Sequence, residues 1–150
     1  MNNYYRGAHA RHYNSRWHTF TERTLAHVLT LLERNMLQFA PATSHRRLRV
    51  LDVACGTGRL LELLSQQIPT LEGVGVDASQ DMLVQARKTF PDQSRIHFVQ
   101  AEVGPGERAN LPFEPASFDV ITCSNALHDL RAPLETLQGL LTVALLDSLS

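Results

Sequence analysis

The stretch LDVACGTGRLL, residues 51–61, decides the fold class. An apolar run that begins at Leu48 leads into this stretch, an acid and two glycines follow, and a second apolar run comes after them. A short apolar run of this kind predicts a buried parallel strand. Gly56 and Gly58 permit a sharp turn with no Cβ in the way of a ligand, and a helix that follows directs its free N–H groups at that ligand. The segment therefore predicts a strand, a glycine turn that binds an anionic group, and a helix.

Strands and helices alternate along the rest of the chain. Apolar runs predict strands at 48–54, 71–77, 95–100 and 117–123. Apolar residues at helical spacing, together with flanking prolines, predict helices at 19–39, 59–67 and 81–90 and a last helix from Pro133. Strands that alternate with helices are joined by right-handed crossovers and form a parallel sheet. The pattern therefore predicts a doubly wound α/β fold that an additional helix precedes.

Composition places the chain among ordinary one-domain globular proteins. It has 150 residues, of which 43% are hydrophobic and 19% charged, and its formal net charge is −1. This balance gives no field that favours nucleic acid or a membrane, and no apolar run is long enough to span a bilayer. Residues 1–17 do not resemble a signal peptide, so we expect a cytoplasmic protein. The two cysteines form neither a disulfide framework nor a metal site.

The string D-V-A-C-G-T-G, residues 52–58, resembles the first motif of the class I S-adenosylmethionine-dependent methyltransferases, a Rossmann-like family. A nucleotide-dependent dehydrogenase is the poorer interpretation, because its fingerprint has a third Gly or Ala where Leu61 stands here. In the methyltransferase family the glycine turn wraps the methionine portion of the cofactor, and the sheet order is expected to be 3-2-1-4. The resemblance implies that five residues of this turn contact the cofactor: Asp52, Ala54, Cys55, Gly56 and Gly58.

Asp77 ends the second predicted strand. An acid at this place accepts hydrogen bonds from ribose hydroxyls in dinucleotide folds, and the resemblance implies the same role here. The alternative is an acid that only stabilises the next helix through its dipole, although Ser79 already suits the helix cap. The string D-A-S-Q-D-M-L also resembles the family, which implies cofactor contacts for Ala78 and Met82. Taken alone, a methionine on an apolar helix face is more often a core residue.

The third predicted strand leads to the residues that the resemblance places at the adenine. The string R-I-H-F-V-Q-A-E-V, residues 95–103, resembles the family's third-strand ending, in which an acid contacts the adenine amino group. Glu102 occupies that position, and Ala101 and Val103 flank it. The chain then inserts G-P-G-E-R-A-N before an L-P-F string, which leaves Glu107 as the alternative acid.

The fourth predicted strand ends at Cys123 and Ser124, in a string S-F-D-V-I-T-C-S that again resembles the family. In a 3-2-1-4 order this strand end lies beside the glycine turn. The resemblance therefore implies cofactor contacts for both residues, and we expect Cys55 and Cys123 to lie close together. His128 is a weak candidate for a general base, and an ordinary helix-side histidine is the alternative.

The resemblance divides the chain into an N-terminal arm and helix, residues 1–47, and a cofactor-binding domain, residues 48–150. Five residues of the arm either cover the cofactor or pack on the surface: Tyr4, Tyr5, Tyr13, Arg16 and Trp17. Family members continue past the fourth strand, so we expect the C-terminal strands of the family fold to be absent from this chain. The edge of the fourth strand then needs a homo-oligomer, a C-terminal partner or the last helix to cover it.

These features predict a methyltransferase that uses S-adenosyl-L-methionine and releases S-adenosyl-L-homocysteine. We expect a small-molecule acceptor, no metal, and neither a membrane nor a nucleic-acid partner. The alternative is a catalytically inactive cofactor-binding domain or subunit that lacks the C-terminal half of the fold. The sequence leaves the acceptor and the methylated atom open.

Overall fold

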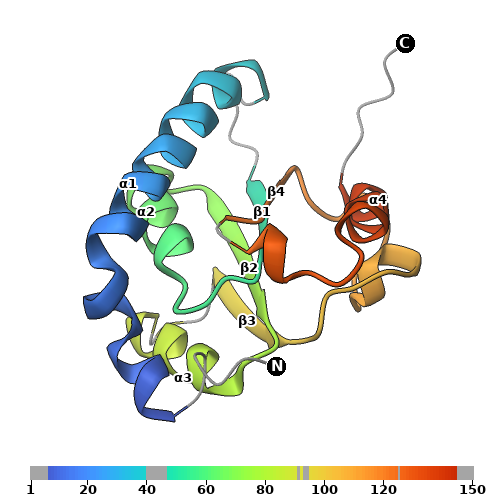
Figure 1. The fold of residues 1–150 in the computed structure, drawn as a ribbon. Helices are drawn as coiled ribbons and strands as arrows, with labels where there is room; N and C mark the ends of the chain where they lie inside the picture. Colours follow the sequence, from blue (N-terminus) through green and yellow to red (C-terminus); the bar gives the residue numbers. More distant parts are fainter. Residues whose placement is uncertain (1–6, 40–46, 91, 93–94, 125, 145–150) are drawn as a thin grey trace.

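A four-stranded parallel sheet forms the centre of the computed structural model, which describes residues 7–39, 47–90, 92, 95–124 and 126–144 (Figure 1). Its strands are β1 (Leu48–Val53), β2 (Leu71–Asp77), β3 (Ile96–Gln100) and β4 (Val120–Thr122). They lie in the order β3-β2-β1-β4, and every pair is parallel. The predicted doubly wound sheet and its 3-2-1-4 order are therefore confirmed.

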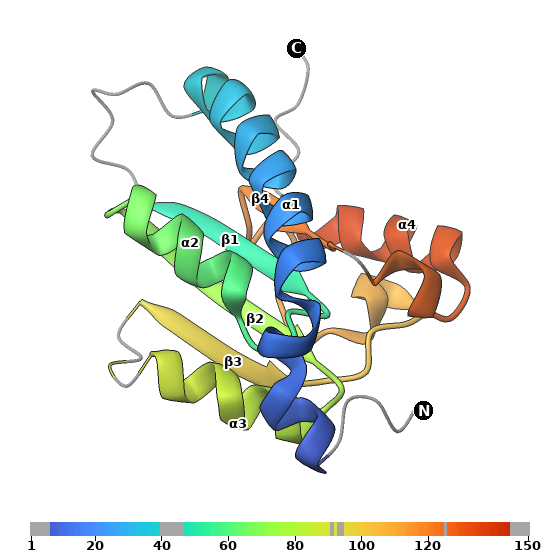
Figure 2. The same cartoon turned by 60° about the vertical axis from the view of Figure 1, so that its left-hand side comes forward.

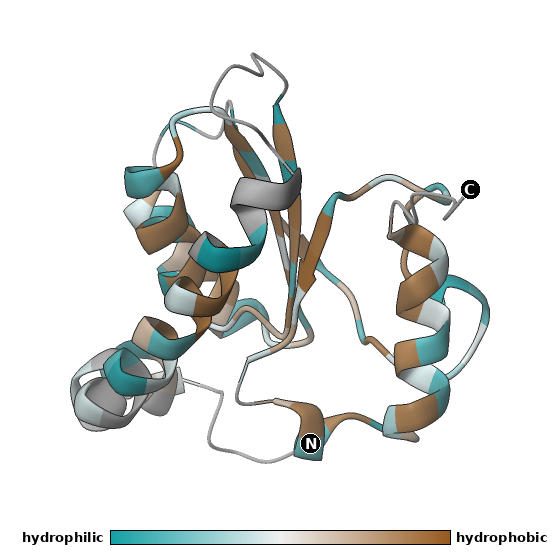
Figure 3. Cartoon of the chain, turned by 90° about the horizontal axis from the view of Figure 1, so that it is seen from above, coloured by the Kyte–Doolittle hydropathy of each residue, from teal (hydrophilic) through white to brown (hydrophobic). Residues whose placement is uncertain are grey.

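Helices cover the two faces of the sheet unequally (Figures 1 and 2). One face carries α1 (Gly7–Phe39), α2 (Arg59–Gln67) and α3 (Gln80–Thr89). The other carries α4 (Pro133–Val143) and the short 3₁₀ turn η2 (Glu107–Asn110), while a second 3₁₀ turn, η3 (Leu127–Asp129), follows β4. Figure 3 shows the sheet edge-on between these two layers, with apolar strands at the centre. Within the described ranges, none of the helices has both the length and the apolar character needed to cross a bilayer.

Alternate residues of β1 belong to two different cores. Leu48 and Val50 pack in the core beneath α1, α2 and α3, whereas Leu51 and Val53 pack in the core beneath α4 and η2. This follows from the strand geometry, since successive side chains point to opposite faces of a sheet. All four are buried, and each full burial of such a side chain contributes about 1.5–3 kcal/mol. The uninterrupted apolar run thus specifies a strand that is covered on both faces.

The first helix is longer than the sequence predicted, because tertiary contacts extend it. The apolar spacing predicted a helix at 19–39, but α1 begins at Gly7. The backbone N–H of Gly7 donates to Asp81 Oδ2 at 2.7 Å, and Ala10 is buried. The predicted apolar stripe is confirmed at Leu25, which is buried, and at its neighbours that pack on the same core: Val28, Leu29 and Leu32. Tyr4 and Tyr5 lie outside the described residues, as do the side chains of Tyr13, Arg16, Trp17, Met36 and Leu37.

The fourth strand is shorter than predicted because the segment before it bonds to α4. The N–H groups of Ala116 and Phe118 donate to the carbonyls of Thr142 and Val143, both at 3.1 Å. Only residues 120–122 of the predicted 117–123 then pair with β1. The two cysteines, which we expected to lie close together, belong to different cores: Cys55 packs against the core under α2 and α3, and Cys123 against the core under α4.

Gly139 in α4 provides a test of how this second layer is held. A Cβ at Gly139 would lie 2.5 Å from the Ala109 backbone nitrogen and 2.6 Å from the Gly106 carbonyl oxygen, so α4 approaches η2 through a position without a side chain. We expect Gly139→Ala to lower the free energy of unfolding in urea by roughly 1–3 kcal/mol, as overpacked cores do. The adjacent, exposed Gln138→Ala is the matched control and should leave it unchanged. Equal stability of the two variants would contradict this packing.

Candidate functional site

A left-handed loop joins β1 to α2 at the carboxyl end of the sheet. Ala54, Gly56 and Gly58 have φ values of 55°, 55° and 76°, and the Gly58 N–H donates to the Cys55 carbonyl at 2.9 Å. A Cβ at Gly58 would lie 2.9 Å from the Phe98 ring, so this position requires glycine for space as well as for conformation. Ala54 adopts the same region at a cost of about 1–2 kcal/mol. The loop therefore stores backbone strain at the place where the sequence predicted ligand contacts.

The carboxylate of Asp77 ties this loop to the end of β2. Its Oδ2 accepts the Gly56 N–H and its Oδ1 accepts the Ser79 N–H, both at 2.8 Å. Burial raises the pKa of Asp77, while hydrogen bonds from the backbone N–H groups of Ser79, Gly56 and Ala78 oppose that rise. A carboxylate accepts about two hydrogen bonds on each oxygen, so these three donors leave it capacity for about one more.

Asp52 is a buried acid behind the same loop. Its side chain is 2% exposed, and its Oδ1 accepts the hydroxyl of Thr122, on β4, at 2.7 Å. Burial raises the pKa of Asp52 to about 7; the Thr122 hydrogen bond opposes that rise, and the negative charge of Asp77 adds to it. Thr122 was not among the residues that the sequence singled out. Its pairing opposite Asp52 in the β1–β4 ladder explains the contact, and this register cannot be read from the sequence.

The two thiols at the site are not reactive groups. Burial, with a smaller contribution from Asp52, raises the pKa of the Cys123 thiol to about 11. Burial and the charges of Asp52 and Asp77 also raise the pKa of the Cys55 thiol. Both cysteines are free and half-buried. Since the thiolate is the nucleophilic form, neither side chain suits nucleophilic chemistry at neutral pH.

The first turn of α3 packs against the glycine loop. Ser79 is the cap, as predicted, and its hydroxyl accepts the Met82 N–H at 3.3 Å. Met82 is 1% exposed, and its Cε lies 3.3 Å from the place of a Cβ on Gly56. The observed contact of Met82 is therefore with the glycine loop. Ala78 is half-buried, and its carbonyl accepts the Gln100 side chain at 3.1 Å, which joins the ends of β2 and β3.

The two candidate adenine acids lie in different surroundings. The Ala101 N–H donates to the Asp77 carbonyl at 3.2 Å, so Glu102 follows directly on the strand end that carries Asp77. Glu102 is exposed, while Val103 is buried in the core under α4. Glu107 instead begins η2, where its exposed carboxylate lies 3.9 Å from Arg108. The structure therefore brings Glu102, and not Glu107, to the carboxyl end of β2 and β3.

The end of β4 carries the remaining predicted residues. Cys123 and Ser124 directly follow the strand and are half-buried. His128 lies in η3, its side chain is 75% exposed, and its Nε2 lies 3.5 Å from Asp129 Oδ2. In the part of the chain that the structure describes, no group of three or more His, Cys, Asp or Glu side chains is arranged to hold a metal ion.

Helix α1 is fastened to the first turns of both helices that begin at the site. Arg59, the first residue of α2, donates from Nε to Glu22 of α1 at 2.9 Å and from a terminal nitrogen to Glu62 at 2.7 Å. Asp81, in the first turn of α3, accepts the Gly7 N–H. These anchors were not predictable from the sequence, because the partners are far apart along the chain and each acid also suits a solvated helix surface.

Comparisons with known proteins agree with this geometry. Residues 51–145 match the family model described as a methyltransferase domain. The chain is 41% identical over 86 residues to a demethylmenaquinone methyltransferase from Deinococcus radiodurans. This match covers 57% of this chain and 34% of that protein. It is also 35% identical over 117 residues to a trans-aconitate 2-methyltransferase from Rhodopseudomonas palustris, and this match covers 77% of this chain and 44% of that protein. The crystal structure of YcgJ from Bacillus subtilis superposes with a TM-score of 0.60 at 25% identity, over 82% of this chain and 46% of the other.

The chain therefore belongs to the methyltransferase domain family. Its fold is that of the class I S-adenosylmethionine-dependent methyltransferases, as the sequence resemblance predicted. The chain spans less than half the length of the curated relatives named above.

The pKa of Asp52 yields a test of the site's electrostatics. An acid whose pKa rises on folding, here from 3.8 to about 7, destabilises the native state progressively as the pH increases between those values. We expect Asp52→Asn to be more stable than the parent at pH 8 by roughly 2–4 kcal/mol, with the difference vanishing below pH 4. Chemical denaturation at a series of pH values measures this.

Thr122→Val is the companion variant, because it removes the hydroxyl that donates to the carboxylate. The hydroxyl bonds more strongly to the ionised carboxylate of Asp52 than to its protonated form. Thr122→Val should therefore lower the free energy of unfolding more at pH 8 than at pH 4. A constant stability difference between Asp52→Asn and the parent across the pH range would show that Asp52 is not a buried acid of this kind.

Proposed function

We propose that the carboxyl ends of β1, β2 and β3 bind S-adenosyl-L-methionine and that the chain transfers its methyl group to a small organic acceptor. The observation that carries this proposal is the Asp77 carboxylate. It holds the Gly56 N–H and the Ser79 N–H at 2.8 Å, and with the further bond from Ala78 it keeps capacity for about one more donor. A carboxylate fixed in this way at the end of the second strand suits a hydroxyl of a ribose.

The other residues of the site fit the remaining parts of this cofactor. The first turn of α2, which begins at Arg59 directly after the loop, offers backbone N–H groups to a carboxylate. The charge of Asp77, with that of Asp52 when it is ionised, favours a ligand that carries an ammonium and a sulfonium. Ala101, Glu102 and Val103 would hold the adenine, with Ala78, Met82, Cys123 and Ser124 as further contacts.

The chain's own contribution to the reaction is positioning. When bound, the cofactor supplies a methyl group on a positively charged sulfur, and its products are the methylated acceptor and S-adenosyl-L-homocysteine. The buried thiols of Cys55 and Cys123 stay protonated at neutral pH and do not compete as nucleophiles. Among the described residues, His128 remains the candidate for accepting a proton from the acceptor, although its exposure gives it no fixed orientation. Alignment of the two reactants is therefore the main source of catalysis.

A small-molecule acceptor is supported by relatives named for demethylmenaquinone and trans-aconitate. These two compounds differ in shape and charge, so the relatives support a small acceptor without identifying a particular compound. We therefore propose an organic acceptor with an acidic C–H or O–H group, of the size of a quinone head group or a small carboxylic acid.

Two matched glutamates test the binding mode. Glu102→Gln and Glu107→Gln make the same chemical change at two exposed positions. We expect Glu102→Gln to weaken binding of S-adenosyl-L-homocysteine about tenfold in isothermal titration, because it loses one charge-assisted hydrogen bond to the adenine amino group. Glu107→Gln should bind like the parent. A larger loss of affinity in Glu107→Gln than in Glu102→Gln would place the adenine at η2 and overturn this assignment.

Asp77→Ala tests the observation on which the proposal rests. We expect affinity for S-adenosyl-L-homocysteine to fall by at least about tenfold, since a charge-assisted hydrogen bond to the ribose is lost. Circular dichroism of the variant confirms that it is folded. Parent-like affinity in a folded variant would refute the ribose role, and absence of binding by the folded parent would refute the cofactor site itself. Transfer of labelled methyl groups to quinones and carboxylic acids then separates an enzyme from a domain that only binds the cofactor.

A further inference from the structure

Asp52 is a buried acid at the carboxyl end of β1 whose carboxylate has little hydrogen-bond support. Its Oδ1 accepts the Thr122 hydroxyl at 2.7 Å, and the residues that the structure describes provide no further hydrogen bond to this carboxylate. The side chain is 2% exposed, so water solvates its negative charge poorly. The neighbouring acid, Asp77, accepts three backbone N–H groups instead. A cation near the strand ends would therefore stabilise the ionised form of Asp52 more than water does.

The charge of Asp52 acts on groups at three neighbouring parts of the candidate site. Burial is the main cause of the raised pKa of Cys55, in the glycine loop, and of Cys123, at the end of β4, and Asp52 adds to both shifts. Burial also raises the pKa of Asp52 itself; the Thr122 hydroxyl opposes this shift, and the charge of Asp77, at the end of β2, adds to it. A ligand bound at the ends of β1, β2 and β4 therefore lies within electrostatic range of Asp52.

The cations nearest to these elements have partners of their own. Arg59, at the start of α2, forms ion pairs with one glutamate of α1 and one of α2. Arg87, on α3, donates to a backbone carbonyl of β3, and His128 lies 3.5 Å from Asp129 in η3. In the described part of the chain, Asp52 forms no ion pair with any of them. The buried acid therefore leaves its charge available to a bound cation.

We propose that Asp52 makes the site prefer S-adenosyl-L-methionine over S-adenosyl-L-homocysteine, and that Thr122 sets the pH above which this preference is complete. The inference rests on the proposed cofactor site. The two ligands share an ammonium and a carboxylate, and they differ at sulfur, which is a sulfonium in the first and a neutral thioether in the second. Ionised Asp52 attracts the sulfonium, whereas protonated Asp52 does not distinguish the two ligands by charge. Loss of the methyl group therefore removes this attraction and favours release of the product.

The direction of the pH effect follows from the charge of the ionised form. The pKa of Asp52 is about 7 in the free protein, so the carboxyl group is mostly protonated at pH 6 and mostly ionised at pH 8. A cation lowers that pKa, so binding of S-adenosyl-L-methionine near pH 6 releases protons, and its affinity increases with pH until Asp52 is ionised without it. Binding of S-adenosyl-L-homocysteine should release fewer protons, since it carries no charge on sulfur.

Isothermal titration of both ligands at pH 5.5, 6.5 and 7.5 tests the proposal. In the parent we expect the preference for S-adenosyl-L-methionine, expressed as the ratio of the two affinities, to increase at least about fivefold over this range. This follows because a nearby opposite charge lowers the pKa of an acid by about one unit or more. In Asp52→Asn the ratio should not change with pH. A constant ratio in the parent, or an increase that persists in Asp52→Asn, would overturn this inference alone, whereas a folded parent that binds neither ligand would refute the cofactor site as well.

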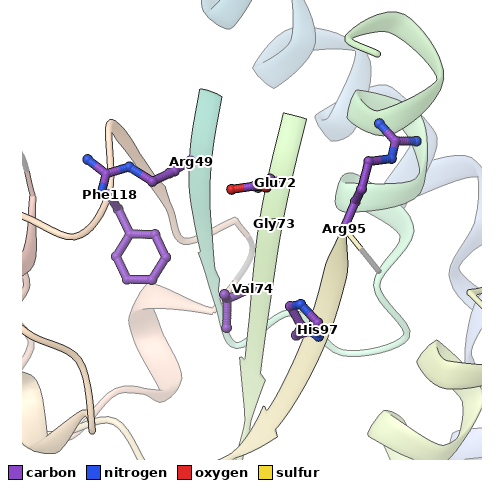
Figure 4. A pocket seen from close by; sticks show the side chains of 7 residues that line it. All are labelled: Arg49, Glu72, Gly73, Val74, Arg95, His97 and Phe118. Carbon is purple, nitrogen blue, oxygen red and sulfur yellow. The ribbon is translucent and has the colours of Figure 1, made fainter. Parts of the chain in front are cut away.

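His97→Gln is the matched control for other groups that titrate. Histidine is the side-chain type that changes charge between about pH 5 and 8. Figure 4 shows His97 of β3 beside Val74 of β2, in a hollow at the amino ends of the strands and thus at the opposite end of the sheet from the glycine loop. His97 is exposed, so its replacement leaves the packing of the site intact. This variant should show the same pH dependence as the parent, and loss of that dependence would contradict the assignment to Asp52.

Thr122→Val and Thr122→Ser test the role of the hydroxyl. The Thr122 hydrogen bond lowers the pKa of Asp52, so its removal in Thr122→Val should shift the increase in the affinity ratio to higher pH. Thr122→Ser keeps the donor and should behave like the parent. The carboxyl carbon resonance of Asp52 in NMR spectra of the ligand-free chain measures the same pKa without any cofactor. Titration of that resonance near pH 4, or an unchanged midpoint in Thr122→Val, would refute the proposed pH control.

Discussion

The bridge that Asp77 makes between two backbone segments is the interaction on which the site depends. One carboxylate holds the Gly56 N–H of the loop after β1 and the Ser79 N–H at the start of α3. It therefore fixes the position of the glycine loop relative to the second strand, while Met82 supports the same loop through packing. The loop contains three residues at positive φ, and such strain persists only when neighbouring contacts over-determine it. Asp77 supplies the contact that does so from outside the loop.

The site keeps its negative charge at the expense of stability. Asp52 is buried deeply enough for its pKa to rise to about 7, and a single hydroxyl, that of Thr122, compensates part of the cost. An apolar residue would pack in this place without that penalty, which a buried acid does not avoid. Burial, with a smaller contribution from the same acid charges, also raises the pKa of the neighbouring thiols. Binding chemistry and stability thus oppose each other at one residue.

Sequence patterns predicted most elements because these depend on local signals, whereas the sheet order was an expectation from the family resemblance, which the structure confirms. The apolar run before Asp52, the glycines of the loop and the Ser79 cap are each readable within a few residues. The start of α1 at Gly7, the pairing of Thr122 with Asp52 and the anchor between Arg59 and Glu22 were not predictable, since each depends on partners brought together by folding. Which acid contacts the adenine stays a prediction, and the structure adds that Glu102 directly follows the strand end that carries Asp77.

The two faces of the sheet have different functions in this arrangement. The face beneath α1, α2 and α3 carries Cys55 of the glycine loop, whereas the face beneath α4 carries Val103 and Cys123. Leu140 and Val143 connect these parts, because they pack in the same core as Val103. Helix α4 therefore supports one side of the candidate site through this shared core.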